Sequence, residues 1–313
     1  MKICAQASPQ GGESKGGRTT LAPYRALPHC AAQESKAVTG INYEAEYDNR
    51  ARVPEHPQIF ARWATDSASY RARLPAPRQV RMSYGPTPRE IIDLFDARPD
   101  APLAVFIHGG WWRNFEPSLF SHLAGGLNAH GIGVALPGYN LCPQVSIADI
   151  IEEIRCAVLA LWRRYGKRML VLGHSAGGHL TATLLATDWP ARDATAPADL
   201  VPAGYAISGV YDLAPLVHVS MNQDLRLDVD GARKISPVSW PAPRGSVLDA
   251  VVGARESNEF LRQSRIIADV WGKAGVATRY EEIAGADHFT VLDPLTDPDS
   301  AMVARLLALM PKP

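Results

Sequence analysis

Apolar residues along the chain follow two alternating patterns: short runs that are apolar throughout, and longer stretches where they recur every three or four residues. Runs such as LAVFI at 103–107 are too uniformly apolar for a strand with one exposed face, and they indicate a sheet buried on both faces. Strands are predicted at residues 78–84, 89–96, 103–107, 132–136, 169–172, 204–208, 247–252 and 277–283. Helical spacing predicts helices at residues 118–130, 147–165, 176–187, 257–273 and 299–310.

The order of these elements predicts an α/β fold, with a mostly parallel central sheet covered by helices on both faces. The first two strands are joined by the turn GPTP, and we expect them to form an antiparallel hairpin. The helix between Ser146 and Gly166 has the clearest ends, because serine caps a first turn and glycine stops a last one.

The chain is expected to form one domain over residues 41–313. Residues 1–40 are rich in Gly, Ser, Ala and Gln without periodicity, which predicts a flexible extension. Residues 41–78 carry scattered aromatic residues and are expected to be partly helical and to pack on the core. A stretch rich in Pro and Asp at 210–243 interrupts the alternation of strands and helices, and we expect it to form a lid insert.

Charge and motif content exclude several classes of protein. The 313 residues include 32 Lys and Arg against 32 Asp and Glu, which argues against a nucleic-acid binder or a polybasic membrane-surface protein. No apolar run approaches the roughly 18 residues of a membrane span, and the first residues lack the apolar core of a secretory signal, so a cytoplasmic protein is expected. No HExxH motif and no helix-opening GxGxxG occurs, so we expect neither a metal nor another cofactor. The oligomeric state, a homodimer included, stays open.

The strongest chemical signal is GHSAGG at 173–178, between a predicted strand and a predicted helix. A GxSxG sequence in that context is typical of the nucleophile elbow, a strained turn that lifts a serine Oγ above the sheet. Small flanking residues let the helix pass close to the strand, and the N–H of Ala176 at the helix start can stabilise an oxyanion. We therefore expect Ser175 to be a nucleophile; a glycine-rich turn with an incidental serine is the alternative.

The sequence HGGWW at 108–112 directly follows a predicted buried strand. The loop that completes an oxyanion hole occupies this position in such folds, and glycine lets the backbone approach a carbonyl group closely. Gly109 and Gly110 are therefore the expected donors of two further N–H groups. A Gly-Gly turn that only packs aromatic residues is the alternative.

A serine hydroxyl needs a base that titrates near neutrality, which is the role of histidine. His288 is the only histidine after the strand predicted at 247–252, and it follows Ser175 as the required order of nucleophile, acid and base demands. The other histidines are interpreted as incidental or structural: His122 is expected in a loop or surface helix, and His179 is expected to pack.

The acid that supports the histidine is expected on the loop after the strand at 247–252. Glu256 lies just beyond the end of that strand and is the preferred residue. Three alternatives are weighed: Glu259 is expected in the first turn of the next helix, Asp249 within the strand, and Asp287 beside the base but pointing away.

Several segments resemble the kynurenine formamidases (arylformamidases), a family of α/β-hydrolases: HGGWW, GHSAGGHL, SGVYDLAPL, NQDLRLD and ADHFTVLDPLTDP. The resemblance runs from about Tyr43 to the C-terminus. HGG with GxSxG is shared with many esterases, whereas SGVYDL and DHF are more specific. Members of the family usually carry Asp at the acid position, so Glu256 departs from the pattern.

The resemblance implies an α/β-hydrolase fold and a role for each matching residue. Ser175 would be the nucleophile, Glu256 the acid and His288 the base. The N–H groups of the oxyanion hole would come from Gly109, Gly110 and Ala176.

The resemblance also implies a serine hydrolase of tryptophan catabolism that cleaves an aryl formamide such as N-formylkynurenine into the amine and formate. An aromatic pocket is expected from Trp111, Trp112 and Tyr139 with the insert at 210–243, and core packing is an equal alternative for Trp112 and Tyr139. A carboxylesterase or amidase for another small aryl ester, amide or carbamate is the alternative function. A third reading is an inactive α/β-hydrolase that serves as a binding module.

Overall fold

The computed structural model describes residues 40–312 of the chain. Residues 42–313 form one compact unit. The extension expected at residues 1–40 falls, apart from Gly40, outside the described residues. No helix within residues 40–312 combines the length and the apolar character that a membrane crossing requires.

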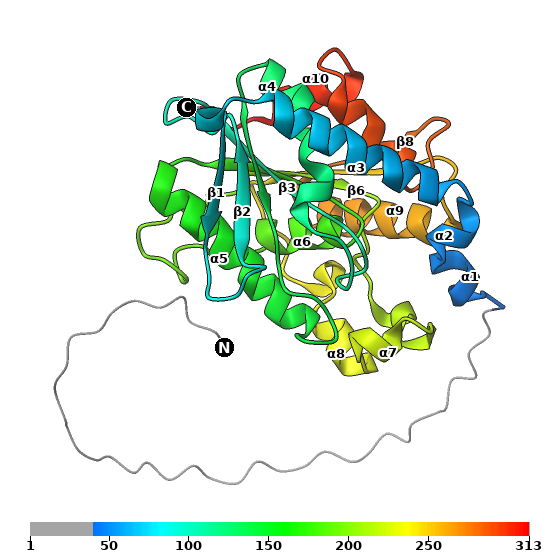
Figure 1. The fold of residues 1–313 in the computed structure, drawn as a ribbon. Helices are drawn as coiled ribbons and strands as arrows, with labels where there is room; N and C mark the ends of the chain where they lie inside the picture. Colours follow the sequence, from blue (N-terminus) through cyan, green and yellow to red (C-terminus); the bar gives the residue numbers. More distant parts are fainter. Residues whose placement is uncertain (1–39, 313) are drawn as a thin grey trace, which may run out of the picture. The chain divides into compact units, whose positions relative to one another are not determined.

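An eight-stranded sheet forms the centre of the compact unit (Figure 1). In spatial order its strands are β1 (Gln79–Ser83), β2 (Ile91–Phe95), β4 (Gly133–Pro137), β3 (Leu103–Ile107), β5 (Met169–His174), β6 (Ala203–Ile207), β7 (Val247–Gly253) and β8 (Ala277–Ile283). The pairs β1–β2 and β2–β4 are antiparallel, and all other neighbours are parallel. The predicted hairpin and the mostly parallel α/β sheet are both confirmed.

Helices are present in the segments predicted at 147–165, 176–187, 257–273 and 299–310, and further short helices lie in segments where the spacing of apolar residues predicted none. The α-helices are α1 (Tyr43–Tyr47), α2 (Asn49–Arg52), α3 (His56–Arg73), α4 (Gly125–Ala129), α5 (Ile147–Tyr165), α6 (Ala176–Leu185), α7 (Asn222–Leu225), α8 (Val229–Lys234), α9 (Asn258–Lys273) and α10 (Ala301–Leu309). The 3₁₀ helices are η1 (Ala76–Arg78), η2 (Pro117–Ala124), η3 (Ala214–His218), η4 (Pro237–Ser239) and η5 (Thr290–Thr296).

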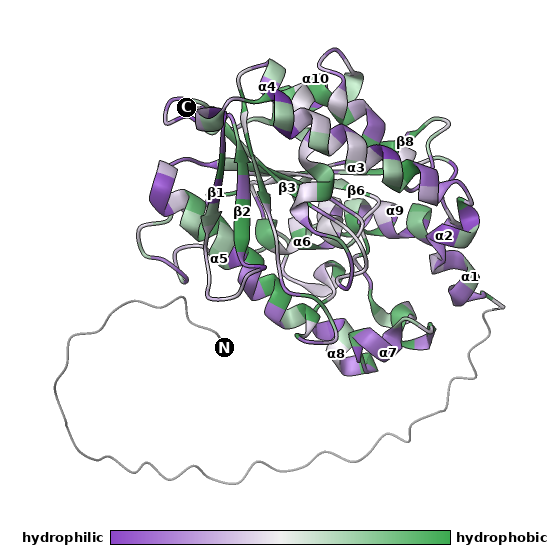
Figure 2. Ribbon diagram, in the orientation of Figure 1, coloured by the Kyte–Doolittle hydropathy of each residue, from purple (hydrophilic) through white to green (hydrophobic). Residues whose placement is uncertain are grey.

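Helices cover both faces of the sheet because each face carries its own cluster of buried apolar residues. On one face the helices α5, α6 and α9 contribute side chains such as Ile154, Leu180 and Phe260. On the other face α3 and η2 contribute Trp63 and Phe120. Figure 2 shows hydrophobic residues along the central strands between these layers. The predicted arrangement of helices on both faces is therefore present.

The ends of α5 follow from local chemistry. The Ser146 hydroxyl accepts the N–H of Asp149, and the Asp149 carboxylate accepts the N–H of Ser146, which forms a capping box. At the other end Gly166 has φ of 62°, a left-handed conformation that glycine adopts at little cost. Both predicted helix ends are confirmed.

The helix predicted at 118–130 differs from the structure, which has the 3₁₀ helix η2 followed by the short helix α4. Gly125 and Gly126 stand at the junction, and glycine has a low helix propensity. A Cβ at Gly126 would lie 2.4 Å from the carbonyl oxygen of Leu295. Close packing against η5 therefore prevails over one continuous α-helix.

The carboxyl ends of parallel strands meet at one edge of the sheet, where open α/β folds bind their ligands. His108 follows β3, Ser175 follows β5, Glu256 lies beyond β7 and His288 lies beyond β8. Since β3, β5, β6, β7 and β8 are successive neighbours, these four residues are brought to the same edge.

Candidate active site

Ser175 occupies a strained turn between β5 and α6. Its φ and ψ are 56° and −117°, a combination that is unfavourable for a residue with a Cβ and that persists only where the surroundings enforce it. The N–H of Ser175 donates to the carbonyl of Ile207 at 2.8 Å, which ties the turn to β6. A Cβ at Gly177 would lie 1.9 Å from the carbonyl oxygen of Ile107, so the elbow requires glycine there. The strand–turn–helix context predicted for GHSAGG is present.

The loop after β3 lies directly against this turn. A Cβ at Gly109 would stand 2.9 Å from the Cβ of Ser175, so the bare glycine backbone faces the serine side chain. Gly110 has φ of 106°, which also favours glycine. Among the described residues, the N–H groups of Gly109, Gly110 and Ala176 donate to no protein acceptor. The three N–H groups expected to hold an oxyanion are therefore unpaired beside Ser175.

His288 is held by Glu256 through a short hydrogen bond. Its Nδ1 lies 2.6 Å from Oε2 of Glu256, and both side chains are almost fully buried. An ionised carboxylate can only accept, so Nδ1 carries the hydrogen and Nε2 is left as a proton acceptor. The other carboxylate oxygen of Glu256 accepts the hydroxyl of Ser208 and, at 2.8 Å, the N–H of Gly253. The carboxylate is thus fixed on both sides.

Ser175 and His288 line the same cavity. Within residues 40–312 no hydrogen bond joins the Ser175 hydroxyl to a protein group, so its Oγ is available. His174 contacts His288: its Nε2 lies 2.7 Å from the carbonyl oxygen of His288, and the two ring centroids are 4.7 Å apart. Burial lowers the pKa of His174 well below its usual value, so this ring stays neutral and can donate to that carbonyl.

The three other carboxylates weighed as the acid have hydrogen-bond partners other than His288. Oε2 of Glu259 accepts the hydroxyl of Tyr47 at 2.8 Å, in the first turn of α9. Asp249 lies within β7 and pairs with Arg305 at 2.7 Å. Oδ1 of Asp287 accepts two backbone N–H groups of its own turn. None of the three has a hydrogen bond to the imidazole of residue 288.

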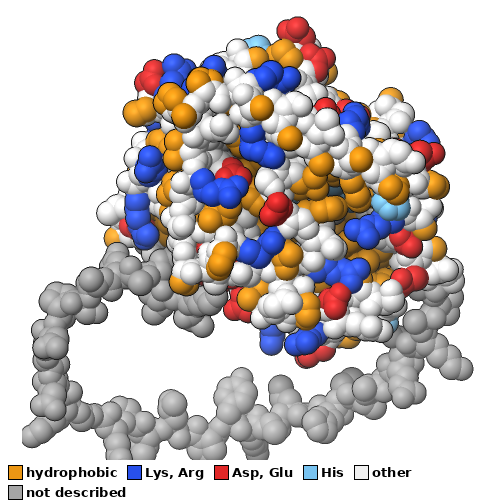
Figure 3. All heavy atoms as spheres, viewed as in Figure 1, with side chains coloured by type: hydrophobic (Ala, Val, Ile, Leu, Met, Phe, Trp, Pro, Cys, Tyr) orange, Lys and Arg blue, Asp and Glu red, His pale blue; other side chains and the backbone are white. Residues whose placement is uncertain are grey.

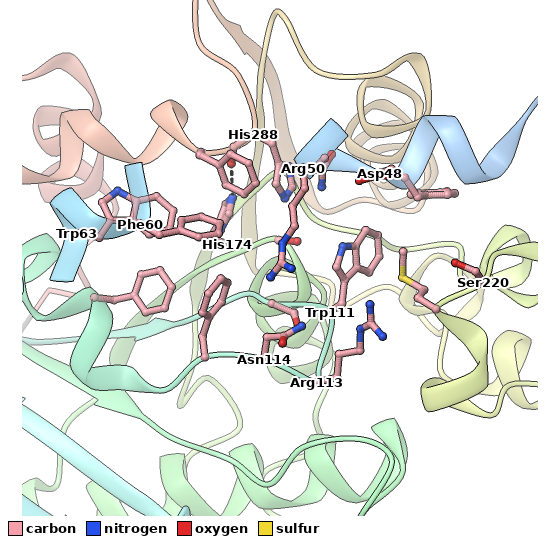
Figure 4. A pocket seen from close by; sticks show the side chains of 18 of the residues that line it. Asp48, Arg50, Phe60, Trp63, Trp111, Arg113, Asn114, His174, Ser220 and His288 are labelled. Carbon is pink, nitrogen blue, oxygen red and sulfur yellow. Dashed lines mark hydrogen bonds between the residues drawn. The ribbon is translucent and has the colours of Figure 1, made fainter. Parts of the chain in front are cut away.

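The cavity is lined by both aromatic and charged side chains. Figure 4 shows Phe60 and Trp63 on one side, Trp111 on the other, and the Arg50 side chain between them. On the face of the molecule seen in Figure 3, hydrophobic side chains gather around a recess, with charges of both signs interspersed. Further aromatic walls of the cavity are Phe115, Phe120 and Phe289.

Two of the three aromatic residues expected in the pocket lie behind it. Trp112 is fully buried, with its ring edge-on to His179, and Tyr139 stacks on His108 at 4.4 Å and donates its hydroxyl to the carbonyl of that residue. Trp111 lines the cavity as expected. Trp111 and Trp112 both have φ of 54°, and this left-handed turn sends one ring to the cavity and the next into the core.

For two other histidines, the sequence predicted one environment correctly and one wrongly. His122 is buried in η2, with Nδ1 2.7 Å from the Ser67 hydroxyl, so its expected place in a loop or surface helix is wrong. The reason is that α3 covers this segment, which the local pattern does not show. His179 is packed, as expected, with Nε2 2.8 Å from the carbonyl of Ile235.

Sequence reasoning missed the residues that reach the cavity from outside the sheet. Asp48 lies between α1 and α2, and Asn49 and Arg50 belong to α2. Phe60 comes from α3. The aromatic composition of residues 41–78 indicated packing on the core but carried no signal for an arginine in the site. Ser208, the second partner of Glu256, lies at the start of the SGVYDL segment without any motif of its own.

No family model matches the chain. A kynurenine formamidase of Drosophila melanogaster is 30% identical over 234 residues, which cover 70% of this chain and 77% of that protein. The chain belongs to the kynurenine formamidase family. A kynurenine formamidase of Danio rerio is 27% identical over 259 residues, covering 80% of this chain and 87% of that protein.

Solved structures share the fold of this chain. A candidate thioesterase from Silicibacter sp. superposes with a TM-score of 0.75 at 34% identity and covers 86% of this chain and 100% of that one. An esterase of Pyrobaculum calidifontis, at a TM-score of 0.60 and 17% identity over 87% of this chain and 100% of that one, shares the fold. As a member of the kynurenine formamidase family, the protein has the α/β-hydrolase fold and is a serine hydrolase.

Proposed function

We propose that this hydrolase cleaves an aryl formamide, such as N-formylkynurenine, to the free aryl amine and formate. The observation that carries the proposal is the buried His288–Glu256 hydrogen bond of 2.6 Å at a cavity that Ser175 also lines. The relatives named kynurenine formamidase support the choice of substrate. The aromatic walls of the cavity suit the aryl group of such a substrate.

The proposed reaction begins when the Oγ of Ser175 attacks the formyl carbon and its proton passes to Nε2 of His288. The Glu256 carboxylate stabilises the imidazolium that results. The carbonyl oxygen becomes an oxyanion, and the unpaired N–H groups of Gly109, Gly110 and Ala176 are available to hold it.

The second half of the reaction releases both products. The C–N bond of the tetrahedral intermediate breaks as His288 returns its proton to the departing amine, which leaves a formyl ester on Ser175. Water then attacks this ester with His288 again as the base, and formate leaves as the serine regains its proton.

We also infer that the segment 210–243 closes one side of the site as a lid insert. It consists of η3, α7, α8 and η4, and it contributes Ser220 and Met221 to the cavity. The N–H and hydroxyl of Ser220 donate to the carboxylate of Glu44, which links this segment to α1. Residues 42–313 would then form one hydrolase domain with this insert.

The second candidate function is that of an esterase or amidase for another small aryl ester, amide or carbamate. It is favoured by the 34% identity to the candidate thioesterase. A serine that attacks a formamide carbonyl can also attack the carbonyl of an ester or a thioester. The arrangement of Ser175, His288 and Glu256 would serve either substrate.

The deciding experiment compares kcat/KM of the purified protein for N-formylkynurenine and for p-nitrophenyl acetate, with Ser175→Ala as the blank. We expect the formamide to be the better substrate and the Ser175→Ala variant to lose several orders of magnitude in kcat with an unchanged fold. Efficient ester cleavage with the formamide untouched would favour the second function. Absence of Ser175 labelling by a fluorophosphonate probe would favour the inactive binding module.

A further inference from the structure

One cationic side chain of the cavity has no acidic partner among the described residues. Arg50 belongs to α2, and its side chain reaches into the middle of the cavity beside Trp111 (Figure 4). Its guanidinium lies 6.0 Å from the ring centroid of Phe60, and it makes no ion pair within residues 40–312. Arg113, the other arginine of the cavity, is paired with Asp224 at 2.5 Å.

A second unpaired donor lies next to this arginine in the sequence. Asn49 lines the same cavity and is only 5% exposed, and within the described part of the chain its Nδ2 has no hydrogen-bond partner. Buried polar groups in folded proteins nearly always find a partner, so the unpaired Nδ2 at the cavity wall is a donor available to an acceptor atom of a ligand. A ligand that engages both side chains must offer acceptor atoms.

The acidic side chains of the cavity are engaged by donors of the protein itself. The Glu44 carboxylate accepts the N–H and the hydroxyl of Ser220 at 2.7 and 2.6 Å. Oδ1 of Asp48 accepts the N–H of Ala51 at 3.0 Å, which caps α2. Both carboxylates therefore have hydrogen-bond donors of the protein, whereas the guanidinium of Arg50 has no acceptor among the described residues.

We propose that Arg50, with Asn49, binds a carboxylate carried by the amine portion of the substrate. A guanidinium matches the two oxygens of a carboxylate with two parallel hydrogen bonds, and charge-assisted bonds of this kind are stronger than neutral ones. The proposal rests on the proposed function in one respect: a formyl group bears only hydrogen, so in a formamide the carboxylate must sit on the leaving amine. The substrate class is thus an aryl formamide with an anionic arm.

The experiment uses two matched pairs of substrates. The first pair is a formanilide with a carboxylate arm and its primary carboxamide analogue, which removes the charge at nearly constant shape. The second pair is the corresponding aryl acetates. For each enzyme variant we measure the ratio of kcat/KM between the charged and the neutral member, so that a loss of folded protein cancels. In the wild type we expect a ratio of about 10 or more, with the difference mainly in KM.

In the Arg50→Gln variant the ratio should fall to about 1, and Arg50→Lys should retain part of it, because lysine keeps the charge but loses the fork geometry. The matched control is Arg73→Gln, which removes one positive charge at the exposed end of α3 outside the cavity, and we expect the wild-type ratio there.

The outcomes separate this proposal from the proposed function. Cleavage of formanilides with a wild-type ratio near 1, or with the same ratio in Arg50→Gln as in the wild type, overturns the role of Arg50 and leaves the formamidase function standing. Cleavage of the aryl acetates alone, with an Arg50-dependent preference for the charged member, supports the carboxylate site and removes the formamidase function.

Discussion

The Nδ1 of His288 lies 2.6 Å from Oε2 of Glu256, although 32 residues separate them in the chain. The two side chains come from the loops after neighbouring parallel strands, β8 and β7. The second carboxylate oxygen is held by Ser208 and by the backbone of Gly253. This carboxylate therefore has no freedom to rotate away from the imidazole, and it fixes which ring nitrogen carries the hydrogen.

Replacing Glu256 by Gln tests this relationship. The amide removes the negative charge that stabilises the imidazolium and can present an N–H to the ring, so we expect kcat to fall by about 10³- to 10⁴-fold. Glu256→Asp should retain more activity, because it keeps the charge with one methylene less. The measurement is kcat on the best substrate of the panel, together with the melting temperature.

The matched control is Asp249→Asn. Asp249 is also a buried carboxylate, but it lies within β7, pairs with Arg305 of α10 and does not reach the site. This variant should lower the melting temperature and leave kcat of the folded protein close to that of the wild type. A Glu256→Gln enzyme with wild-type kcat would mean that another group supports the base.

Replacing Gly109 by Ala tests the close approach of the loop to the elbow. The new Cβ would lie 2.8 Å from the carbonyl oxygen of His174 and 2.9 Å from the Cβ of Ser175, so the loop or the serine must shift. A displacement of about 1 Å at a reacting group costs on the order of 100-fold in rate, and we expect a loss of about 10- to 100-fold in kcat.

Gly125→Ala provides the comparison, because the nearest atom to its Cβ would be Cε2 of Tyr70 at 3.6 Å, an ordinary contact. Its kcat should match the wild type. Equal activities for Gly109→Ala and Gly125→Ala would show that the space beside Ser175 is not needed for catalysis.

The two adjacent tryptophans are expected to respond differently to truncation. Trp112 is fully buried, so Trp112→Ala should destabilise the fold by about 3–5 kcal/mol, seen as a lower denaturation midpoint. Trp111 lines the cavity, so Trp111→Ala should chiefly raise KM for aryl substrates while the melting temperature changes less. A reversed pattern, with KM sensitive to Trp112 and stability to Trp111, would contradict the placement of the two rings.

Stability is expected to fall in mild acid because of buried neutral histidines. Burial lowers the pKa of His108, His122 and His179 to about 4 each, below the value of about 6.5 for an exposed imidazole. Between these two values the unfolded chain binds more protons than the folded one. The free energy of unfolding is therefore at its full value above about pH 6.5 and decreases as the pH falls toward 4, by up to about 1.4 kcal/mol per pH unit for each histidine.

Urea unfolding at pH 7, 6 and 5 measures this slope. His179→Gln, which keeps a donor for the carbonyl of Ile235, removes one of the titrating rings and should reduce the slope between pH 6 and 5. A wild-type stability that is constant over this range would mean that these rings are charged in the folded protein.

Much of the fold was determined by local patterns. The continuous run at Leu103–Ile107 and the capped stretch Ile147–Tyr165 have the predicted bounds, because strand burial and helix capping depend on residues close together in the sequence. The helix predicted at 118–130 failed for the opposite reason: contact with the distant Leu295 decides the geometry at Gly126.

The sequence by itself determined where the chemistry-bearing loops begin, because GHSAGG and HGGWW each follow a strand whose apolar run is unmistakable. Only the tertiary structure decided which carboxylate meets His288, which tryptophan faces the cavity, and that Arg50 enters it from a helix outside the sheet. The physical reason is that backbone conformation follows from short-range sterics and capping. Side-chain convergence depends instead on strand register and on packing between segments that are far apart in the chain.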